Sequence, residues 1–248
     1  MSRKKDTIYQ QANATVGSFR FDAKVADVFT DMIERSVPGY TQILTLLPSL
    51  VRQGVAADVR GSYYDLGSSL GAGMIAIAQG LTDADRSKII GVDNSAAMID
   101  AASIKLEGLG AHYGVDFSLV NEDINKMQFD KAAMILMNFT LQFLPIAERA
   151  NLIQRCYDAL SSGGRLVVSE KIQFDDSKIN KALVDIHHQF KEDQGYSRLE
   201  ISQKRDAIEN VLIPETLTAH MQRLRDAGFS VVVPWIQNLQ FASILSIK

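Results

Sequence analysis

From Tyr63 to Gly73 the chain reads Tyr-Tyr-Asp-Leu-Gly-Ser-Ser-Leu-Gly-Ala-Gly. The run predicts a short buried strand that ends near the carboxylate of Asp65 and is followed by a glycine turn that opens a helix. Such a turn lets a ligand approach bare backbone, where the N–H groups of the helix N-terminus can bind an acceptor. We therefore expect a nucleotide-cofactor site here. An ordinary glycine turn between a strand and a helix is the structural alternative.

Short β-like runs alternate with amphipathic helical stretches from this strand onward. The five runs are residues 62–66, 88–93, 116–121, 132–138 and 164–170. Strands that alternate with helices predict a parallel sheet covered on both faces. Two further β-rich segments, residues 229–236 and 239–247, are separated by the turn-like Gln237-Asn238 and must pair antiparallel because the link is short. The sequence thus predicts an α/β, Rossmann-like fold with a mostly parallel sheet and a C-terminal antiparallel hairpin.

Helical patterns flank the strand region. Apolar residues recur at helical spacing from Phe19 to Ile33, and a second helix follows Tyr40. A long charged helical stretch interrupts the alternation before a last helix, expected within residues 214–228, and the hairpin. We expect one α/β domain over residues 1–248, with an N-terminal helical lid over residues 1–55 and a helical insertion over residues 175–212.

The composition disfavours several functional classes. The 248 residues are 46% hydrophobic, enough for a substantial core, and 26 basic against 29 acidic side chains leave a net charge of -3, so we expect no direct nucleic-acid partner. The single cysteine, Cys156, lies in an apolar helical pattern, and no metal-ligand spacing is seen, which fits a reducing cytoplasm. The basic start, Met1 to Thr7, is not followed by the apolar segment of a signal peptide, and no apolar run approaches the roughly 18 residues of a membrane span.

Polar residues end the predicted strands, where ligands of open α/β sheets collect. Asp93 follows the second strand and is placed to bind a ribose diol, or to cap the next helix, a role that Ser95 could equally fill. Asp123 and Ile124 follow the third strand and suit an adenine amino group and ring face, although acidic loop residues are usually just solvated. Asn138 ends the buried fourth strand and needs a partner there, so we expect a cofactor or substrate contact.

The glycine turn departs from the dinucleotide pattern Gly-x-Gly-x-x-Gly, because Ser69 replaces the second glycine. It resembles the methyltransferase motif Asp-x-Gly-x-x-x-Gly, and the terminal hairpin is similar to that of class I S-adenosylmethionine (SAM)-dependent methyltransferases. Four further segments resemble the carboxy-S-adenosyl-L-methionine synthase family. They are Arg35-Ser-Val-Pro-Gly-Tyr40, Asn138-Phe-Thr-Leu-Gln-Phe143, Ser169-Glu-Lys171 and Glu200-Ile-Ser-Gln-Lys-Arg205. The resemblance extends from about Phe19 to the final strands.

This resemblance implies the class I methyltransferase fold, SAM as substrate and no metal. Members of the family convert SAM and prephenate to carboxy-SAM and phenylpyruvate, and a separate enzyme uses the product to modify wobble uridine in transfer RNA (cmo5U34). The family is homodimeric. Carried over by position, the resemblance assigns to the cofactor pocket Tyr40, Gly67, Ser68, Ser69, Asp93, Asn94, Asp123, Ile124, Asn138 and Arg205. The family has cysteine where this chain has Ser68, and often alanine at Gly73, and backbone contacts at Ser68 would survive the change.

Arg205 is the candidate for recognition of the added carboxylate. A carboxymethyl sulfonium carries a carboxylate that SAM lacks beside sulfur, and a guanidinium pairs with it bidentately at any working pH. Without the resemblance, Lys204, Arg205, Asp206 and Glu209 would equally well form a solvated helix face with local ion pairs.

The reaction that the resemblance implies needs a site without water. Prephenate aromatises with loss of carbon dioxide and hydroxide, and the deprotonated S-methyl group captures the carbon dioxide, so we expect the helical additions to act as a lid. No side chain stands out as the general base, and His187-His188 is expected to be structural. Two alternatives remain open at this point: an ordinary SAM-dependent small-molecule methyltransferase and a non-catalytic SAM-binding module.

Overall fold

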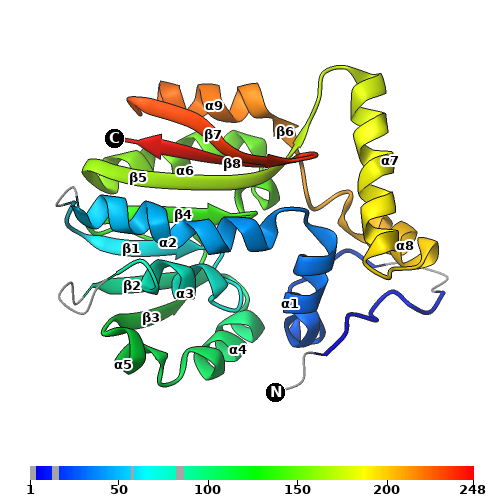
Figure 1. Ribbon diagram of the computed structural model, residues 1–248, viewed down its shortest axis with the longest axis horizontal. Helices are drawn as coiled ribbons and strands as arrows, with labels where there is room; N and C mark the ends of the chain where they lie inside the picture. Colours follow the sequence, from blue (N-terminus) through cyan, green and yellow to red (C-terminus); the bar gives the residue numbers. More distant parts are fainter. Residues whose placement is uncertain (1–3, 13–16, 57–58, 82–86) are drawn as a thin grey trace.

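All five predicted parallel strands are present. The structure is a computed structural model that describes residues 4–12, 17–56, 59–81 and 87–248. The strands are β1 (Ser62–Leu66), β2 (Lys88–Asp93), β3 (Asp116–Asn121), β4 (Ala132–Asn138) and β5 (Leu160–Gln173). They lie in the order β3-β2-β1-β4-β5, and the hairpin strands β8 and β7 extend the sheet beyond β5 (Figure 1). The first four strands have the predicted bounds, whereas β5 extends beyond residues 164–170 at both ends.

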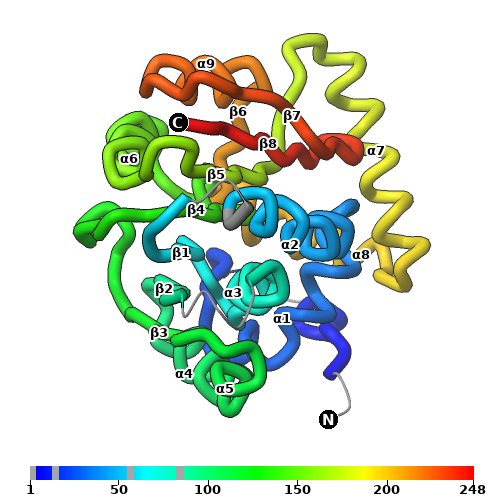
Figure 2. Tube along the Cα trace, turned by 60° about the vertical axis from the view of Figure 1, so that its left-hand side comes forward, coloured from blue at the N-terminus to red at the C-terminus, as the bar shows by residue number. Residues whose placement is uncertain are grey.

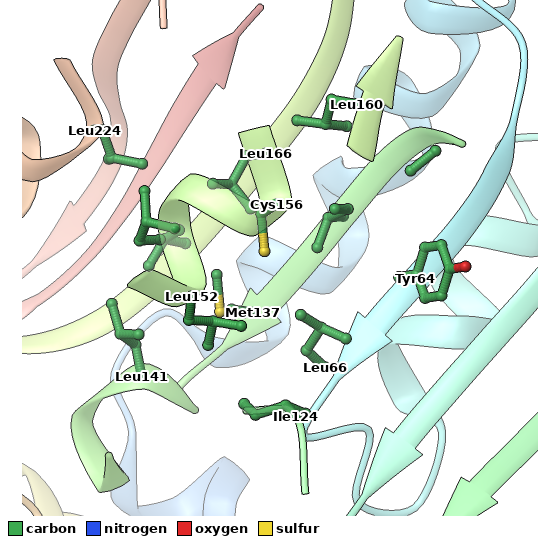
Figure 3. Packing of buried hydrophobic residues seen from close by; sticks show 14 of the residues in the cluster. Tyr64, Leu66, Ile124, Met137, Leu141, Leu152, Cys156, Leu160, Leu166 and Leu224 are labelled. Atoms are coloured by element: carbon green, nitrogen blue, oxygen red, sulfur yellow. The ribbon is translucent and has the colours of Figure 1, made fainter. Parts of the chain in front are cut away.

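The strands are apolar on both faces because helices cover both. Successive side chains of a strand point to opposite faces, so Met137 of β4 joins one hydrophobic cluster and Leu136 joins the other. The first cluster packs against α6 (Ile146–Ala159) and α9 (Leu217–Asp226). Figure 3 shows Cys156 of α6 inside this cluster, which confirms the predicted core position of that thiol.

The opposite cluster packs against α2 (Tyr40–Ala56) and α3 (Ala72–Ala78), which lie side by side in Figure 2. Two further helices, α4 (Ala96–Leu106) and α5 (Leu109–Tyr113), connect β2 to β3. The sheet is therefore the middle layer of three, as the alternation of strands and helices predicted.

The C-terminal hairpin is antiparallel as predicted, but its turn lies two residues later. β7 (Val231–Asn238) runs through Gln237-Asn238, and β8 (Phe241–Ile247) begins after a turn in which Leu239 has a φ of +53°. The prediction of a turn at Gln237-Asn238 was wrong because these polar residues form the last pairs of the ladder with β8.

Three helices lie beyond the carboxyl ends of the parallel strands, on the right of Figure 1: α1 (Ala23–Ser36), α7 (Ser177–Asp193) and α8 (Arg198–Ile208). Asp22 caps α1 by accepting from the backbone N–H of Val25, so Phe19 and Phe21 precede the helix that their spacing suggested. The insertion is two helices instead of one stretch, because Gly195 has a φ of +86° and Ser197 starts a capping box with Glu200.

Three further points differ from the predictions or lie outside the described residues. The short strand β6 (Glu215–Thr216) pairs with β5 and was not predicted, and the last helix, α9, is shorter than residues 214–228. Residues 1–3 and 13–16 of the predicted lid over residues 1–55 lie outside the described part of the chain.

Arg149 of α6 ties the segment after β4 to the chain that leaves the insertion. This guanidinium is fully buried. It donates to the backbone carbonyls of Gln142, Leu144 and Ile213. It also pairs with Glu215 at 2.6 Å. Four acceptors from two distant segments therefore depend on one buried cation.

Replacing Arg149 with methionine should lower the free energy of unfolding by about 3–5 kcal/mol, because three backbone carbonyls lose the hydrogen bonds of the guanidinium and the partly buried Glu215 keeps, among the described residues, only Arg223 as a partner. Burial alone would raise the pKa of Glu215, but hydrogen bonds from Arg223 and Arg149 outweigh burial and lower it. Urea unfolding measures the loss. An Arg225→Met control on the exposed side of α9 should change stability by less than about 0.5 kcal/mol. A comparably small loss for Arg149→Met would contradict this reading.

Candidate active site at the carboxyl edge of the sheet

The carboxyl ends of the parallel strands open into two adjoining cavities of about 620 and 300 Å³. All ten predicted cofactor-pocket residues line one or both. Gly67, Ser69 and Asn138 line both. The larger cavity adds Asp93, Asn94, Asp123, Ile124 and Arg205. The smaller adds Tyr40 and Ser68. Residues from six segments far apart in the sequence are thus brought to one place.

The glycine turn after β1 needs its glycines. Gly67 has a φ of +75° and Gly71 a φ of +76°, a backbone region that disfavours other residues. A Cβ at Gly67 would also lie 2.3 Å from Oγ1 of Thr140. Ser69 has a φ of +46°, and its N–H donates to the Asp93 carboxylate at 2.9 Å. The turn is therefore held open toward the cavities by sterics and by a bond to the next strand.

Asp93 joins two loops at the edge of the sheet. Its second carboxylate oxygen accepts from the N–H of Ser95 at 2.9 Å. The side chain of Ser95, not that of Asp93, caps α4, so the capping alternative for Asp93 is wrong. Burial raises the pKa of Asp93 although both backbone N–H groups oppose the rise. Burial, and then the charge of Asp93, raise the pKa of neighbouring Asp65 to about 7.

Gln240, which lines the larger cavity, has a buried Oε1 with no hydrogen-bond partner among the described residues. Two residues, one after β1 and one at the end of β4, likewise have an unpartnered buried oxygen: Oγ of Ser68 and Oδ1 of Asn138. Buried polar atoms are rarely left in that state unless a ligand or water completes them. Ser68 and Asn138 line the smaller cavity. The prediction that Asn138 needs a partner beyond the strand is thus consistent with its surroundings, and the site fits a ligand that brings hydrogen-bonding groups.

The segment after β4 is held by β5. Phe139 has a φ of +65°, and the short 3-10 helix η1 (Leu141–Phe143) follows. The carboxylate of Glu170 accepts from the N–H groups of Leu141 and Gln142, both at 2.9 Å. Burial raises the pKa of Glu170 to about 8 against these bonds. Glu170 therefore positions the backbone next to Asn138.

The larger cavity also has a cationic side, of which sequence reasoning assigned only Arg205 to the site. It is lined by Lys171 from β5, Lys191 from α7, and Lys204 and Arg205 from α8. Nζ of Lys204 donates to Oγ of Ser36 at 3.0 Å. Arg205 pairs with Asp206 at 3.1 Å and is more than half exposed. The sequence shows that these cations lie among other charged residues, but it does not show which side of each helix faces the cavity.

Burial lowers the pKa of Lys171, and lowers that of Lys204 to about 8. Burial, followed by the charges of Lys204 and Lys171, lowers the pKa of Lys191 to about 7. The other charged or titratable groups that line this cationic side are His187, His188, Arg205 and Glu209. The cavity thus holds positive charges that repel one another.

His187 has the structural role expected of it. Its Nε2 lies 2.7 Å from the carbonyl oxygen of Ser36, and burial lowers its pKa to about 3, so the ring is neutral and donates to that carbonyl. Burial and the charge of Lys191 also lower the pKa of His188, which borders the cavity. Among the described residues, no group of three His, Cys, Asp or Glu side chains is arranged to hold a metal ion.

Replacing Lys191 with methionine should stabilise the chain most at low pH. The pKa is about 7 when folded and 10.5 as the ordinary value, so between these values the unfolded chain binds more protons and wild-type stability rises with pH. We expect the advantage of Lys191→Met in the midpoint of thermal unfolding to be largest at pH 6 and to shrink toward pH 10. The control Lys178→Met, on the exposed side of α7, should show no such trend. A pH-independent advantage, or none, would contradict a charged Lys191 in the cavity.

Comparison with known proteins agrees with the fold. Residues 64–164 match the sequence model of a methyltransferase domain. The structure of human N-acetylserotonin methyltransferase with SAM has a TM-score of 0.57 at 16% identity. The match covers 91% of this chain and 55% of the human protein's chain. An O-methyltransferase family protein from Burkholderia thailandensis has a TM-score of 0.58 at 18% identity. That match covers 92% of this chain and 60% of the other chain. These likenesses show the class I methyltransferase fold.

The full-length relatives are more specific. The carboxy-S-adenosyl-L-methionine synthase of Hahella chejuensis is 46% identical over 252 residues, which cover 100% of both chains. The protein of the same name from Actinobacillus pleuropneumoniae is 42% identical over 244 residues, covering 98% of this chain and 99% of that one. The chain is a SAM-using transferase and belongs to the carboxy-S-adenosyl-L-methionine synthase family.

Proposed function

We propose that the chain converts SAM and prephenate to carboxy-SAM and phenylpyruvate. The observation that carries the proposal is that the Arg205 guanidinium lines the same cavity as Gly67, Asp93 and Asn138. A methyl transfer to a neutral acceptor needs no cation there, whereas a carboxylate formed beside sulfur does. The name of the full-length relatives supports the same product.

The reaction balances without an oxidant or a metal. Prephenate loses its ring carboxylate as carbon dioxide and its ring hydroxyl as hydroxide, and becomes phenylpyruvate. The hydroxide takes one proton from the S-methyl group and becomes water, and the methyl carbon forms its new bond to the carbon dioxide. We assign no side chain as general base, because the leaving hydroxide supplies that function.

We assign the ten predicted residues to the adenosyl ligand by their place along the edge. The turn Gly67 to Ser69 and the orphan oxygen of Asn138 face the amino-acid portion, and Tyr40 closes that end. Asp93 and Asn94 suit the ribose hydroxyls. Asp123 and Ile124 suit the adenine amino group and ring face. Arg205 is reserved for the new carboxylate.

The helical additions to the sheet would keep water from the reacting methyl group. Phe21, ahead of α1, makes edge-to-face contacts with Phe29 at 6.2 Å and with Phe143 after β4 at 5.2 Å between ring centroids. These rings join the N-terminal segment to the far side of the larger cavity, which they line. This supports a lid formed by residues 1–55 and by the insertion, residues 175–212, on a single SAM-binding domain, residues 1–248.

The wider context follows from the same proposal. A homodimer in the cytoplasm would make carboxy-SAM without binding nucleic acid, and a separate carboxymethyltransferase would use it on wobble uridine in transfer RNA. The described chain has no helix that is both long enough and apolar enough to cross a membrane.

Incubation of the purified chain with SAM and prephenate should give a SAM-derived species heavier by one carboxyl group, with phenylpyruvate in equal amount and no RNA present. Mass spectrometry of the mixture measures both products. S-adenosylhomocysteine together with a methylated acceptor would instead indicate an ordinary small-molecule methyltransferase. Ligand binding without any turnover would indicate a non-catalytic SAM-binding module.

Replacing Arg205 with alanine should weaken carboxy-SAM binding by about tenfold or more while SAM binding changes little, because only the product offers a carboxylate to the guanidinium. Calorimetric titration of both ligands tests this selectivity. The matched control is Arg198→Ala at the exposed start of the same helix, which pairs with Glu192 away from the cavity. Equal losses for both ligands in the Arg205 variant would show that this side chain does not recognise the carboxylate.

A further inference from the structure

The charges that line the larger cavity are separated by sign. Asp93, Glu122 and Asp123 come from the ends of β2 and β3. A fourth acidic residue, Glu148 of α6, accepts a hydrogen bond from Asn125 after β3. Four cations come from β5, α7 and α8, namely Lys171, Lys191, Lys204 and Arg205. Glu209, directly after α8, is the one carboxylate that the described residues place on their side of the lining. A sulfonium ligand suits the acidic side, because opposite charges attract most where water is scarce. The basic side suits a ligand of negative charge.

Two helices and one strand end build this basic side. On α7 the lining residues are Val184, His187, His188 and Lys191, which share one helical face at spacings of three and four. Across from them, Lys171 of β5 pairs with Phe241 of β8 in the antiparallel ladder, so the two side chains share a face of the sheet. The Phe241 ring meets the His187 ring edge-on at 4.9 Å. Cations and an apolar wall therefore lie together.

Two of the four cations, Lys171 and Lys191, have no hydrogen bond or ion pair to the ammonium group among the described residues, whereas the other two have a side-chain partner. Lys204 is hydrogen-bonded to Ser36, and Arg205 pairs with Asp206. No ion pair to Lys171 or Lys191 is found within the described part of the chain, although burial lowers the pKa of both. Cations drawn away from water without a partner are costly to the fold and are found where a ligand supplies the counter-charge.

We propose that Lys171 and Lys191 bind the carboxylate of the oxo-acid side chain of prephenate, which is the carboxylate kept in phenylpyruvate. This assignment rests on the proposed function and adds to it the subsite of the second substrate. Phe241 and Val184 provide the apolar surface for its ring.

The chemistry decides between the two carboxylates of prephenate. The ring carboxylate loses its charge as it leaves as carbon dioxide, so a strong ion pair to it would stabilise the ground state more than the transition state and slow the reaction. The side-chain carboxylate keeps its charge throughout, so an ion pair to it contributes binding without opposing the bond cleavage. Lysines at this subsite therefore position the substrate and leave the departing group free to face the sulfonium.

Competition with prephenate by two probes tests the subsite: phenylpyruvate, which has the carboxylate, and phenylacetone, which lacks it. Lys191→Gln and Lys171→Gln should each raise the inhibition constant of phenylpyruvate and the KM of prephenate by about 10-fold to 100-fold. Inhibition by phenylacetone should be weak and equal in all variants. The affinity for S-adenosylhomocysteine should stay within about twofold, which also shows that the variants are folded. Lys191→Arg should recover part of the loss, and Lys178→Gln serves as the exposed control on α7.

The possible results separate this assignment from the proposed function. Wild-type turnover of prephenate together with unchanged phenylpyruvate inhibition in both lysine variants would overturn the subsite alone. Equal losses for phenylpyruvate and S-adenosylhomocysteine would also overturn it, because the lysines would then support the fold and not one ligand. If the wild-type chain forms no carboxy-SAM from prephenate, the proposed function fails and the subsite fails with it.

Discussion

Positive charge held away from water without a matching carboxylate is the constraint on which the site depends. The chain contains a cation that is neutralised within the fold and others, removed from water, that are not. Arg149 lies in the core with Glu215 and three backbone carbonyls around it, so its charge is neutralised within the fold. Lys191 has no such set, and the charges of Lys204 and Lys171 add to its burial in lowering its pKa. Removing an unpaired cation from water costs free energy, and a bound anionic ligand would neutralise its charge.

The lining of the same cavity suits two ligands of opposite charge. Strands β1 to β4 end in a glycine turn, carboxylates and the unpartnered oxygen of Asn138, which suit an adenosyl sulfonium. Strand β5 supplies Glu170 to one side and Lys171 to the other, because successive side chains alternate. One strand therefore positions the segment beside the first ligand and contributes a cation to the second. Under the proposed function, this arrangement lets a methyltransferase fold serve a reaction in which the second substrate brings the carboxylate.

Sequence reasoning predicted most of the fold and much of the adenosyl side of the site for physical reasons, whereas Tyr40 was assigned only through the family resemblance. Buried parallel strands are nearly continuous apolar runs, so residues 88–93 and 132–138 could be bounded directly, and Asn138 stood out as a polar end to such a run. The hairpin turn was misplaced because polar Gln237 and Asn238 continue the ladder. Lys171 and Lys191 were missed because a lysine on an amphipathic helix or at a strand end looks solvated until the packing of α7 against β8 is known. Arg205 was found only through the family resemblance, since its own surroundings include an exposed pair with Asp206.

The most direct test is a crystal structure of the chain with S-adenosylhomocysteine and phenylpyruvate bound together. The account predicts the phenylpyruvate carboxylate within about 3 Å of the Lys171 or Lys191 ammonium group, with its ring against Phe241, while the nucleoside contacts Asp93 at the opposite side of the cavity. A phenylpyruvate carboxylate on the acidic side, or outside the cavity while the adenosyl ligand is in place, would contradict the account.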